Sequence, residues 1–246
     1  MKSLPKINFI SETYFNDAYK CIDEFGAVII TNFLQNSQRE ELLKVVEKAT
    51  TNQNHLDPNY KSGKLYTYHD NNKTNNLIKK AYSRIKSPRS LGNITINKMI
   101  KENEGVEKLD VLLKVFKYSL FYSAYNENSY YITYDNCDTI HTAQSPHFDW
   151  RPCLKGMIYL DDCIHQNMGG LFYLPKSHKK NSFVLSNNGL KGLLPGMKDS
   201  NRYYRDSGCL QDDFYYAGSS AGDLLIFNTD GFHYQGRNQN TNFNRI

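Results

Sequence analysis

The amino-acid sequence predicts an α+β protein in which helices come first and strands follow. Through about the first hundred residues, apolar side chains recur at helical spacing; from residue 111 onward, short segments are dense in Val, Leu, Phe and Tyr. The 19 Tyr and 13 Phe residues also favour a β-rich body, because aromatic side chains suit pleated, half-buried surfaces. We see no internal repeat or flexible linker. We therefore expect a single domain over residues 1–246, with a helical part at about 1–108 and a β part at about 109–246.

The helical part contains two well-marked helices with a strand between them. Tyr14–Phe25 has helical spacing and is followed by Gly26, the residue type that most often ends a helix. Ala27–Ile30 is a short apolar run that predicts a strand. Ser37–Glu40 matches a capping box ahead of an apolar stripe, which predicts a second helix. Three further segments are expected to form a polar surface excursion and two more helices: residues 50–76, 77–86 and 94–102.

The β part contains five strand candidates, which are bounded by Gly, Pro, Asn or Asp. They are residues 111–125, 130–134, 154–160, 170–174 and 223–227. A polar, Gly-rich stretch at residues 187–220 separates the last two. A loop of that length in a compact domain is either a lid or binding loop, or a disordered insertion, and the sequence leaves both readings open.

Charge and cysteine content narrow the classes of function. The net charge of +5 comes from Lys and Arg spread along the chain, which indicates a solvated basic surface rather than a nucleic-acid partner. The excess mildly favours a polar or anionic small-molecule ligand. The five cysteines form no C-x-x-C pair, and we expect reduced thiols in a cytoplasmic protein. No segment approaches the roughly 20 apolar residues of a membrane span, and the start of the chain lacks the apolar run of a signal peptide, so no membrane partner is expected.

Two of the seven histidines open an H-x-[DE] triplet, in which the third residue is acidic, at His55–Asp57 and at His147–Asp149. Seven histidines and 25 acidic residues over 246 positions predict about 0.7 such triplets by chance, so the triplet alone decides nothing. Context separates the two, because His55 lies in the polar excursion whereas His147 lies between strand candidates. Residues i and i+2 of an extended chain share a face. His147 and Asp149 can therefore converge on one ion while Phe148 points into packing.

A third candidate ligand follows the last strand candidate. His233 comes six residues after Phe227, the end of the run Gly222–Phe227. Two imidazoles and one carboxylate make the facial triad of non-haem Fe(II) oxygenases, which leaves the other positions of the metal open. A carboxylate co-substrate would also need a cation at its far end. Arg245 lies twelve residues after His233, close enough to return on an adjacent antiparallel strand and grip that carboxylate.

Several sequence blocks occur in one order along the chain, and their order is more specific than any single motif. They are Asp23–Ile30, Ser145–Asp149, Met157–Asp162, Gly169–His178 and Gly222–Phe227, followed by His233 and Arg245. In this order they resemble the phytanoyl-CoA dioxygenase family of Fe(II)/2-oxoglutarate-dependent enzymes, across most of residues 20–246. The resemblance implies a double-stranded β-helix, a jelly-roll or cupin-like barrel at about 109–246, with the N-terminal helices packed on one sheet.

The same resemblance implies an activity and a set of iron ligands. The enzyme would bind Fe(II) through His147, Asp149 and His233, and would use O2 and 2-oxoglutarate to hydroxylate a small molecule, with release of succinate and CO2. Halogenating relatives have a small residue at the position of the carboxylate ligand. Because Asp149 is present, the resemblance favours hydroxylation over halogenation.

The resemblance also implies contacts with the co-substrate. Arg245 would bind the distal carboxylate of 2-oxoglutarate, Met157 would line its pocket, and Gln144 would touch a ligand from the strand edge. Arg245 is followed only by Ile246. We expect that the chain is either cut short here or closes this edge of the barrel in another way.

Two other classes of function remain open at this stage. The first is a cupin-like metalloprotein in which the triad holds another divalent metal for non-oxidative chemistry. The second is a non-catalytic binding module on the same fold. A side chain that anchors 2-oxoglutarate would distinguish the dioxygenase from the first alternative. The presence of all three candidate ligands argues against the second.

Overall fold

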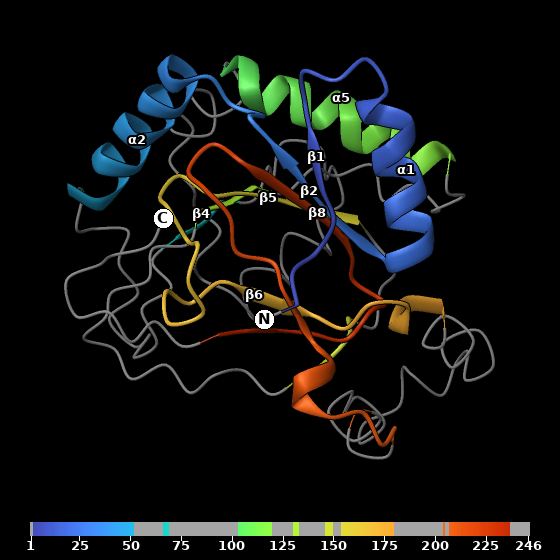
Figure 1. The fold of residues 1–246 in the computed structure, drawn as a ribbon. Helices are drawn as coiled ribbons and strands as arrows, with labels where there is room; N and C mark the ends of the chain where they lie inside the picture. Colours follow the sequence, from blue (N-terminus) through green and yellow to red (C-terminus); the bar gives the residue numbers. More distant parts are fainter. Residues whose placement is uncertain are drawn as a thin grey trace, which may run out of the picture.

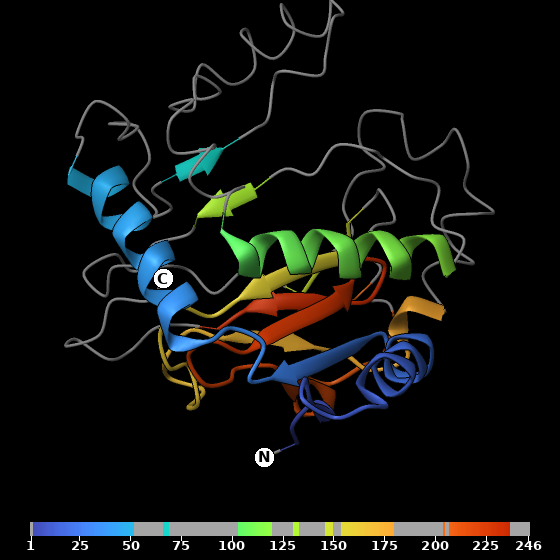
Figure 2. The ribbon, with the colours of Figure 1, turned by 90° about the horizontal axis from the view of Figure 1, so that it is seen from above.

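The computed structural model describes residues 2–51, 66–68, 103–119, 130–132, 146–149, 154–179, 204 and 207–236. In this part of the chain the helices lie to one side of two β-sheets (Figures 1 and 2). The helices are α1 (Tyr14–Phe25), α2 (Asn36–Thr51) and α5 (Glu104–Ser119). The α+β class expected from the sequence is confirmed.

The sheet next to the helices has four strands, in the order β1, β2, β8, β5. β1 runs parallel to β2, and the other two neighbouring pairs are antiparallel. The bounds are Lys6–Asn8 for β1, Ala27–Thr31 for β2, Leu224–Asn228 for β8 and Leu154–Ile158 for β5.

The second sheet is antiparallel, with the order β7, β6, β9. These strands are Tyr215–Tyr216, Leu171–Tyr173 and His233–Gln235. An isolated antiparallel bridge joins His147 to His233, so the segment around His147 extends this sheet beyond β9. A separate antiparallel pair is formed by β3 (Tyr66–Tyr68) and β4 (Tyr130–Ile132).

Alternate residues of the central strands face two different cores. In β2, Val28 and Ile30 pack among the helices, whereas Ala27 and Ile29 face the second sheet. β8 alternates in the same way, so the sheet is apolar on both faces. A third cluster, rich in aromatic side chains, packs around β6 and β9: Phe148, Leu174, Phe214, Phe232 and Tyr234, with Phe172 and Tyr204 against it.

The end of α1 follows the sequence prediction. Gly26 adopts a left-handed conformation with φ 87°, and its N–H donates to the carbonyl of Ile22 at 2.9 Å. A side chain is excluded here for a second reason, because a Cβ on Gly26 would overlap Tyr173 and His178. The helix therefore ends where β2 can begin, at the next residue.

The cap position of α2 is Gln35, two residues before the Ser37 of the predicted capping box. The helix begins at Asn36, which places Ser37 inside the first turn rather than at the cap. Gln38 then occupies the third helical position, and its Oε1 accepts a hydrogen bond from the N–H of Gln35 at 3.1 Å. This is the return half of a capping box with Gln35 in the cap position.

The strand predicted at residues 111–125 is wrong where it is described, because Glu104–Ser119 forms helix α5. Its buried residues Val106, Leu109 and Leu112 recur every three residues on the face toward the first sheet, while Val111 is 60% exposed. A strand was predicted because residue types that favour strands are frequent in this segment. Asn103 supports the helix start, since its Oδ1 accepts the N–H of Gly105 at 3.0 Å.

The remaining predicted elements are confirmed where they are described. β4, β5 and β6 lie within the segments predicted as strands, and β8 extends one residue beyond its predicted segment, to Asn228. Strand β3 was not foreseen within the polar excursion, nor was β7 within the long loop. The helix candidates at 77–86 and 94–102 lie outside the described residues.

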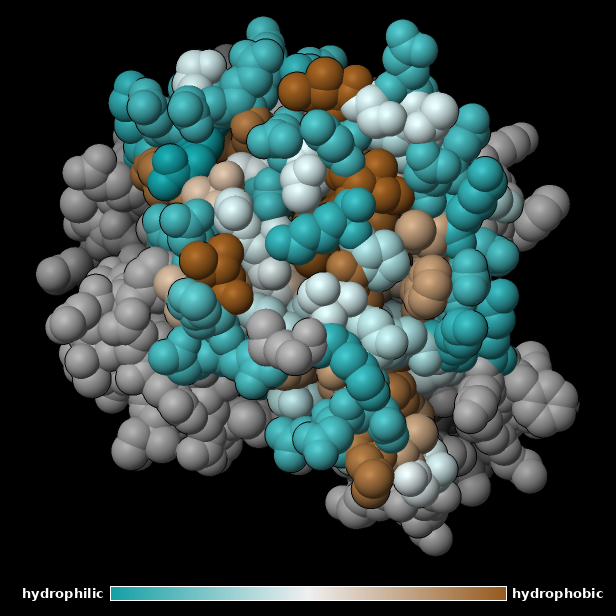
Figure 3. Space-filling view, in the orientation of Figure 1, coloured by the Kyte–Doolittle hydropathy of each residue, from teal (hydrophilic) through white to brown (hydrophobic). Residues whose placement is uncertain are grey.

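The described surface is mixed in character. On the face shown in Figure 3, small hydrophobic groups are interspersed with hydrophilic residues. Cys21, Cys163 and Cys209 are free thiols, and the other two cysteines lie outside the described residues. Within the described part of the chain, none of the helices combines the length and the apolar character that crossing a membrane requires.

Candidate metal site

Backbone hydrogen bonds fix the segment that carries His147 and Asp149. The N–H of His147 donates to the carbonyl of His233 at 3.0 Å, and the N–H of His233 donates back to His147 at 2.8 Å. Two residues further on, the N–H of Asp149 donates to the carbonyl of Thr229 at 2.8 Å. Both residues are thus held against the segment from Thr229 to His233, at the start of β9.

Phe148 anchors this segment from the opposite side. Its side chain is 1% exposed and packs in the aromatic cluster, with its ring centroid 5.7 Å from that of Phe232. The outward alternation expected from an extended H-x-D segment is therefore observed, and burial of Phe148 keeps the two flanking side chains on the other face.

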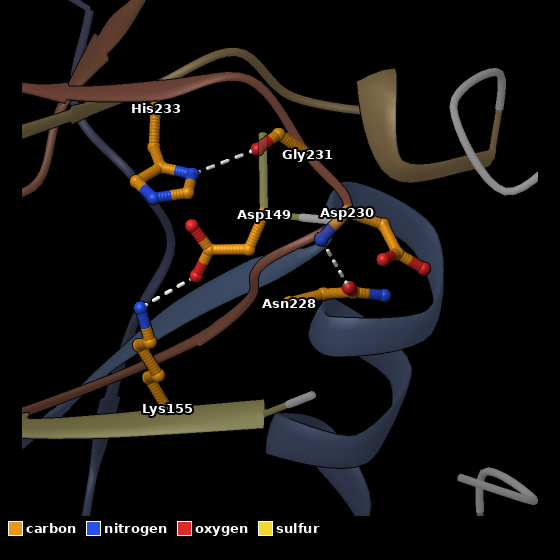
Figure 4. Close-up of polar contacts among 6 residues, drawn as sticks. All are labelled: Asp149, Lys155, Asn228, Asp230, Gly231 and His233. Atoms are coloured by element: carbon orange, nitrogen blue, oxygen red, sulfur yellow. Dashed lines mark hydrogen bonds and ion pairs between the residues drawn. The ribbon is translucent and has the colours of Figure 1, made fainter. Parts of the chain in front are cut away.

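His233 is the first residue of β9 and is held by the turn that precedes it. Its Nδ1 lies 2.9 Å from the carbonyl oxygen of Gly231 (Figure 4). A carbonyl can only accept a hydrogen bond, so Nδ1 carries the proton and Nε2 keeps a free lone pair. The ring also packs edge-on against Phe227 of β8, at a centroid distance of 5.2 Å.

The electrostatics of the site keep this ring neutral. Burial, as the largest cause, lowers the pKa of His233 to about 4. Neighbouring His147 and Lys155 lower it further, whereas the Gly231 carbonyl and the Asp149 carboxylate act in the opposite direction. A neutral imidazole is the form that can bind a metal ion.

The three candidate ligands converge on one point. One ligand atom each from His147, Asp149 and His233 lies within 4.8 Å of the others, and the two imidazole centroids are 4.6 Å apart. Figure 4 shows the Asp149 carboxylate beneath the His233 ring, with one oxygen directed toward that ring. Two neutral nitrogens and one carboxylate fit a divalent transition-metal ion.

A cation from the neighbouring strand also reaches the site. Lys155 Nζ lies 2.6 Å from Asp149 Oδ2 (Figure 4). Lys155 was not among the predicted site residues, although a strand was predicted through it. The alternation with Met157 on the same strand was the signal that could have placed it on the site's side of the sheet.

The other predicted site residues are placed only in part. Met157 lies on β5 and packs, partly buried, against the core between the two sheets. Gln144 and Arg245 lie outside the described residues.

Comparison with known proteins gave matches of two kinds. Residues 133–246 match the sequence profile of the family described as Phytanoyl-CoA dioxygenase (PhyH), and this segment contains all three candidate ligands. None of the curated protein sequences compared with the chain matches it.

Among solved structures, similar folds occur in proteins of low sequence identity. EvdO2 from Micromonospora carbonacea var. aurantiaca, complexed with 2-oxoglutarate, is 13% identical with a TM-score of 0.52, covering 100% of this chain and 90% of that one. AviO1 from Streptomyces viridochromogenes Tue57 is 16% identical with a TM-score of 0.53, covering 96% and 92%. The non-heme alpha ketoglutarate dependent epimerase SnoN from nogalamycin biosynthesis is 12% identical with a TM-score of 0.54, covering 96% and 80%. At these identities the likeness shows the fold.

Proposed function

Since residues 133–246 belong to the phytanoyl-CoA dioxygenase family, we propose that the chain is a non-haem Fe(II)/2-oxoglutarate-dependent dioxygenase. Its reaction is the hydroxylation of a small organic molecule by O2, with 2-oxoglutarate converted to succinate and CO2. The observation that carries the proposal is the convergence of His147, Asp149 and His233 within a segment that matches this family. Residues 1–246 form one domain, and the two sheets are the walls of a double-stranded β-helix.

His147, Asp149 and His233 would hold the iron. When bound there, Fe(II) supplies a centre that activates O2 together with 2-oxoglutarate. The protein's part is to present the ligands in fixed positions. The Gly231 carbonyl orients His233 so that Nε2 faces the site, and the buried Phe148 holds His147 and Asp149 on the opposite side of their strand.

The co-substrate would lie over the face of the site that the three ligands leave open. We assign its distal carboxylate to Arg245, and we assign pocket contacts to Met157 and Gln144. The support for Met157 is its place on β5, two residues from Lys155 and against the core between the sheets. A guanidinium suits a carboxylate because its two parallel N–H groups match the two oxygens.

The substrate is a small molecule of polar or anionic character. The support is the excess of basic residues, a net charge of +5, together with the ammonium of Lys155 beside the triad. Hydroxylation is favoured over halogenation because the third ligand position carries the carboxylate of Asp149 rather than a small side chain.

The test is formation of succinate from 2-oxoglutarate by iron-loaded protein in air. The assay follows turnover of the co-substrate alone, so the identity of the substrate is not needed. Succinate should form only when both Fe(II) and 2-oxoglutarate are present, and Asp149→Ala should abolish it. His165→Gln is the control, because its side chain is exposed and is not part of the group of candidate metal ligands.

The result also separates the alternatives. Metal binding at the triad without succinate formation would contradict the dioxygenase proposal and favour non-oxidative chemistry at another divalent metal. Absence of metal binding by the wild-type protein would favour a non-catalytic binding module.

A further inference from the structure

The contact between Lys155 and Asp149 makes the two oxygens of the carboxylate different from each other. Lys155 Nζ lies 2.6 Å from Oδ2, and Figure 4 shows the other oxygen of Asp149 directed toward His233. One oxygen is therefore engaged by the ammonium, and the other faces His233. The pair is only partly exposed, at 47% for the Lys155 side chain and 29% for that of Asp149.

The position of Lys155 is set by the register of the first sheet. Leu154 packs in the core on the helical side, so the next residue points to the other face of β5. Lys155 pairs with Phe227 of β8 in that register, and Phe227 contacts the ring of His233 at 5.2 Å. The strand pairing that builds the sheet thus brings the ammonium to the triad.

Stability does not account for this arrangement. An ion pair with this much exposure contributes little to folding. A positive charge beside a metal site also opposes the binding of a cation. The arrangement has a chemical consequence, however. A carboxylate with both oxygens available can chelate a metal ion and occupy two positions, whereas a carboxylate with one oxygen engaged offers a single donor.

We propose that Lys155 is a positioning residue that holds Asp149 as a one-oxygen metal ligand, so that the remaining positions stay available for 2-oxoglutarate. The inference rests on the proposed function, because it needs a metal ion at the triad. It adds a fourth residue to the site, from a strand that carries none of the three ligands.

The test compares Lys155→Met with Lys155→Arg, and with Lys179→Met as a matched control. Lys179 is also half exposed, at 54%, and pairs at 3.8 Å with Asp23, which is not one of the candidate metal ligands. Fe(II) affinity is measured anaerobically by competition with a coloured chelator, and 2-oxoglutarate affinity by the visible charge-transfer band. X-ray absorption of the Fe(II) protein reports whether the carboxylate binds through one oxygen or two.

Lys155→Met is expected to move the two affinities in opposite directions. Fe(II) should bind about tenfold more tightly, because a repelling charge is lost and a second oxygen is freed. 2-Oxoglutarate should bind at least about tenfold more weakly, in the range typical of residues that orient metal ligands. The X-ray absorption spectrum should change to that of a two-oxygen carboxylate. Lys155→Arg should restore all three readouts, and Lys179→Met should leave them at wild-type values.

Each outcome has a distinct meaning. Absence of Fe(II) binding by the wild-type protein would overturn the proposed function and this inference with it. Wild-type binding with unchanged affinities and spectrum in a folded Lys155→Met, judged by its thermal unfolding, would overturn the inference alone. If Lys155→Met does not fold, Lys155→Gln is compared with Lys155→Arg instead. A Lys155→Gln spectrum that matches that of Lys155→Arg would overturn the inference.

Discussion

Replacement of Gly231 by alanine tests how the turn before β9 holds His233. A Cβ at this position would overlap the hydroxyl end of Tyr173 and would lie 2.8 Å from its Cε2. Tyr173 is fully buried, and its hydroxyl donates to the carbonyl of Asn228 at 3.1 Å, so the ring has no room to retreat. We expect the turn to move instead, and with it the Gly231 carbonyl that lies 2.9 Å from His233 Nδ1.

The expected effect has two parts. The overlap with Tyr173 lowers the stability of the fold, and the lost orientation of His233 lowers the affinity for Fe(II). Overpacking of a well-filled core costs about 1–3 kcal/mol. For a chain of 246 residues, this lowers the unfolding temperature by about 2–12 °C. Mutation of a group that orients a metal-binding histidine lowers metal affinity by about 10–100-fold. Gly231→Ala should therefore weaken both folding and Fe(II) binding.

The assay is thermal unfolding of the metal-free protein, combined with anaerobic Fe(II) titration. Tyr173→Leu provides the second arm, because a smaller side chain removes the overlap. The double variant should be more stable than the sum of the two single effects by about 1 kcal/mol or more. A lower unfolding temperature with wild-type Fe(II) affinity would refute the role of the Gly231 carbonyl in orienting His233. Wild-type values for both would refute the predicted overlap itself.

Three further predictions concern the triad and its support. Because burial lowers the pKa of His233 to about 4, the unfolded chain binds a proton near pH 6.5 that the folded metal-free protein does not bind until about pH 4. The free energy of unfolding therefore has its full value above about pH 6.5 and falls by roughly 3 kcal/mol as the pH drops to about 4. In urea unfolding, His233→Gln should flatten this decline, and an unchanged pH profile in the variant would contradict the prediction. Phe148→Ala should destabilise the protein by about 3–5 kcal/mol in chemical unfolding, and Phe148→Leu by much less; similar losses in both would contradict its role as the packed anchor. Asp149→Ala should remove succinate formation while leaving a folded protein by circular dichroism, and residual turnover at the wild-type rate would exclude Asp149 from the iron.

Local sequence signals were sufficient for much of the fold. The helix that ends at Gly26 was predictable because its apolar spacing and its cap agree with each other. Strands β5 and β8 were predictable because each is an apolar run bounded by turn residues. Helix α5 was missed because its Val, Leu and Phe content is typical of strands. Its burial pattern is decided by packing against the first sheet, which composition does not report.

The candidate site was predictable in its ligands but not in its support. His147 and Asp149 could be paired from their spacing alone, and His233 from its place after a strand. Gly231 could not be found in this way, and for Lys155 the strand alternation gives its face of the sheet but not its contact with Asp149. The role of Lys155 depends on the register between β5 and β8, and that of Gly231 on the approach of a tyrosine ring from β6. Both are contacts between segments far apart in the chain.

If the triad binds Fe(II) and presents it to 2-oxoglutarate, the complex should absorb visible light. The most direct measurement is anaerobic titration of the metal-free protein with Fe(II) and then with 2-oxoglutarate, followed by visible absorption. We expect a weak charge-transfer band that needs both components and is absent in His233→Ala. A folded, iron-loaded wild-type protein that shows no band with 2-oxoglutarate would contradict this expectation.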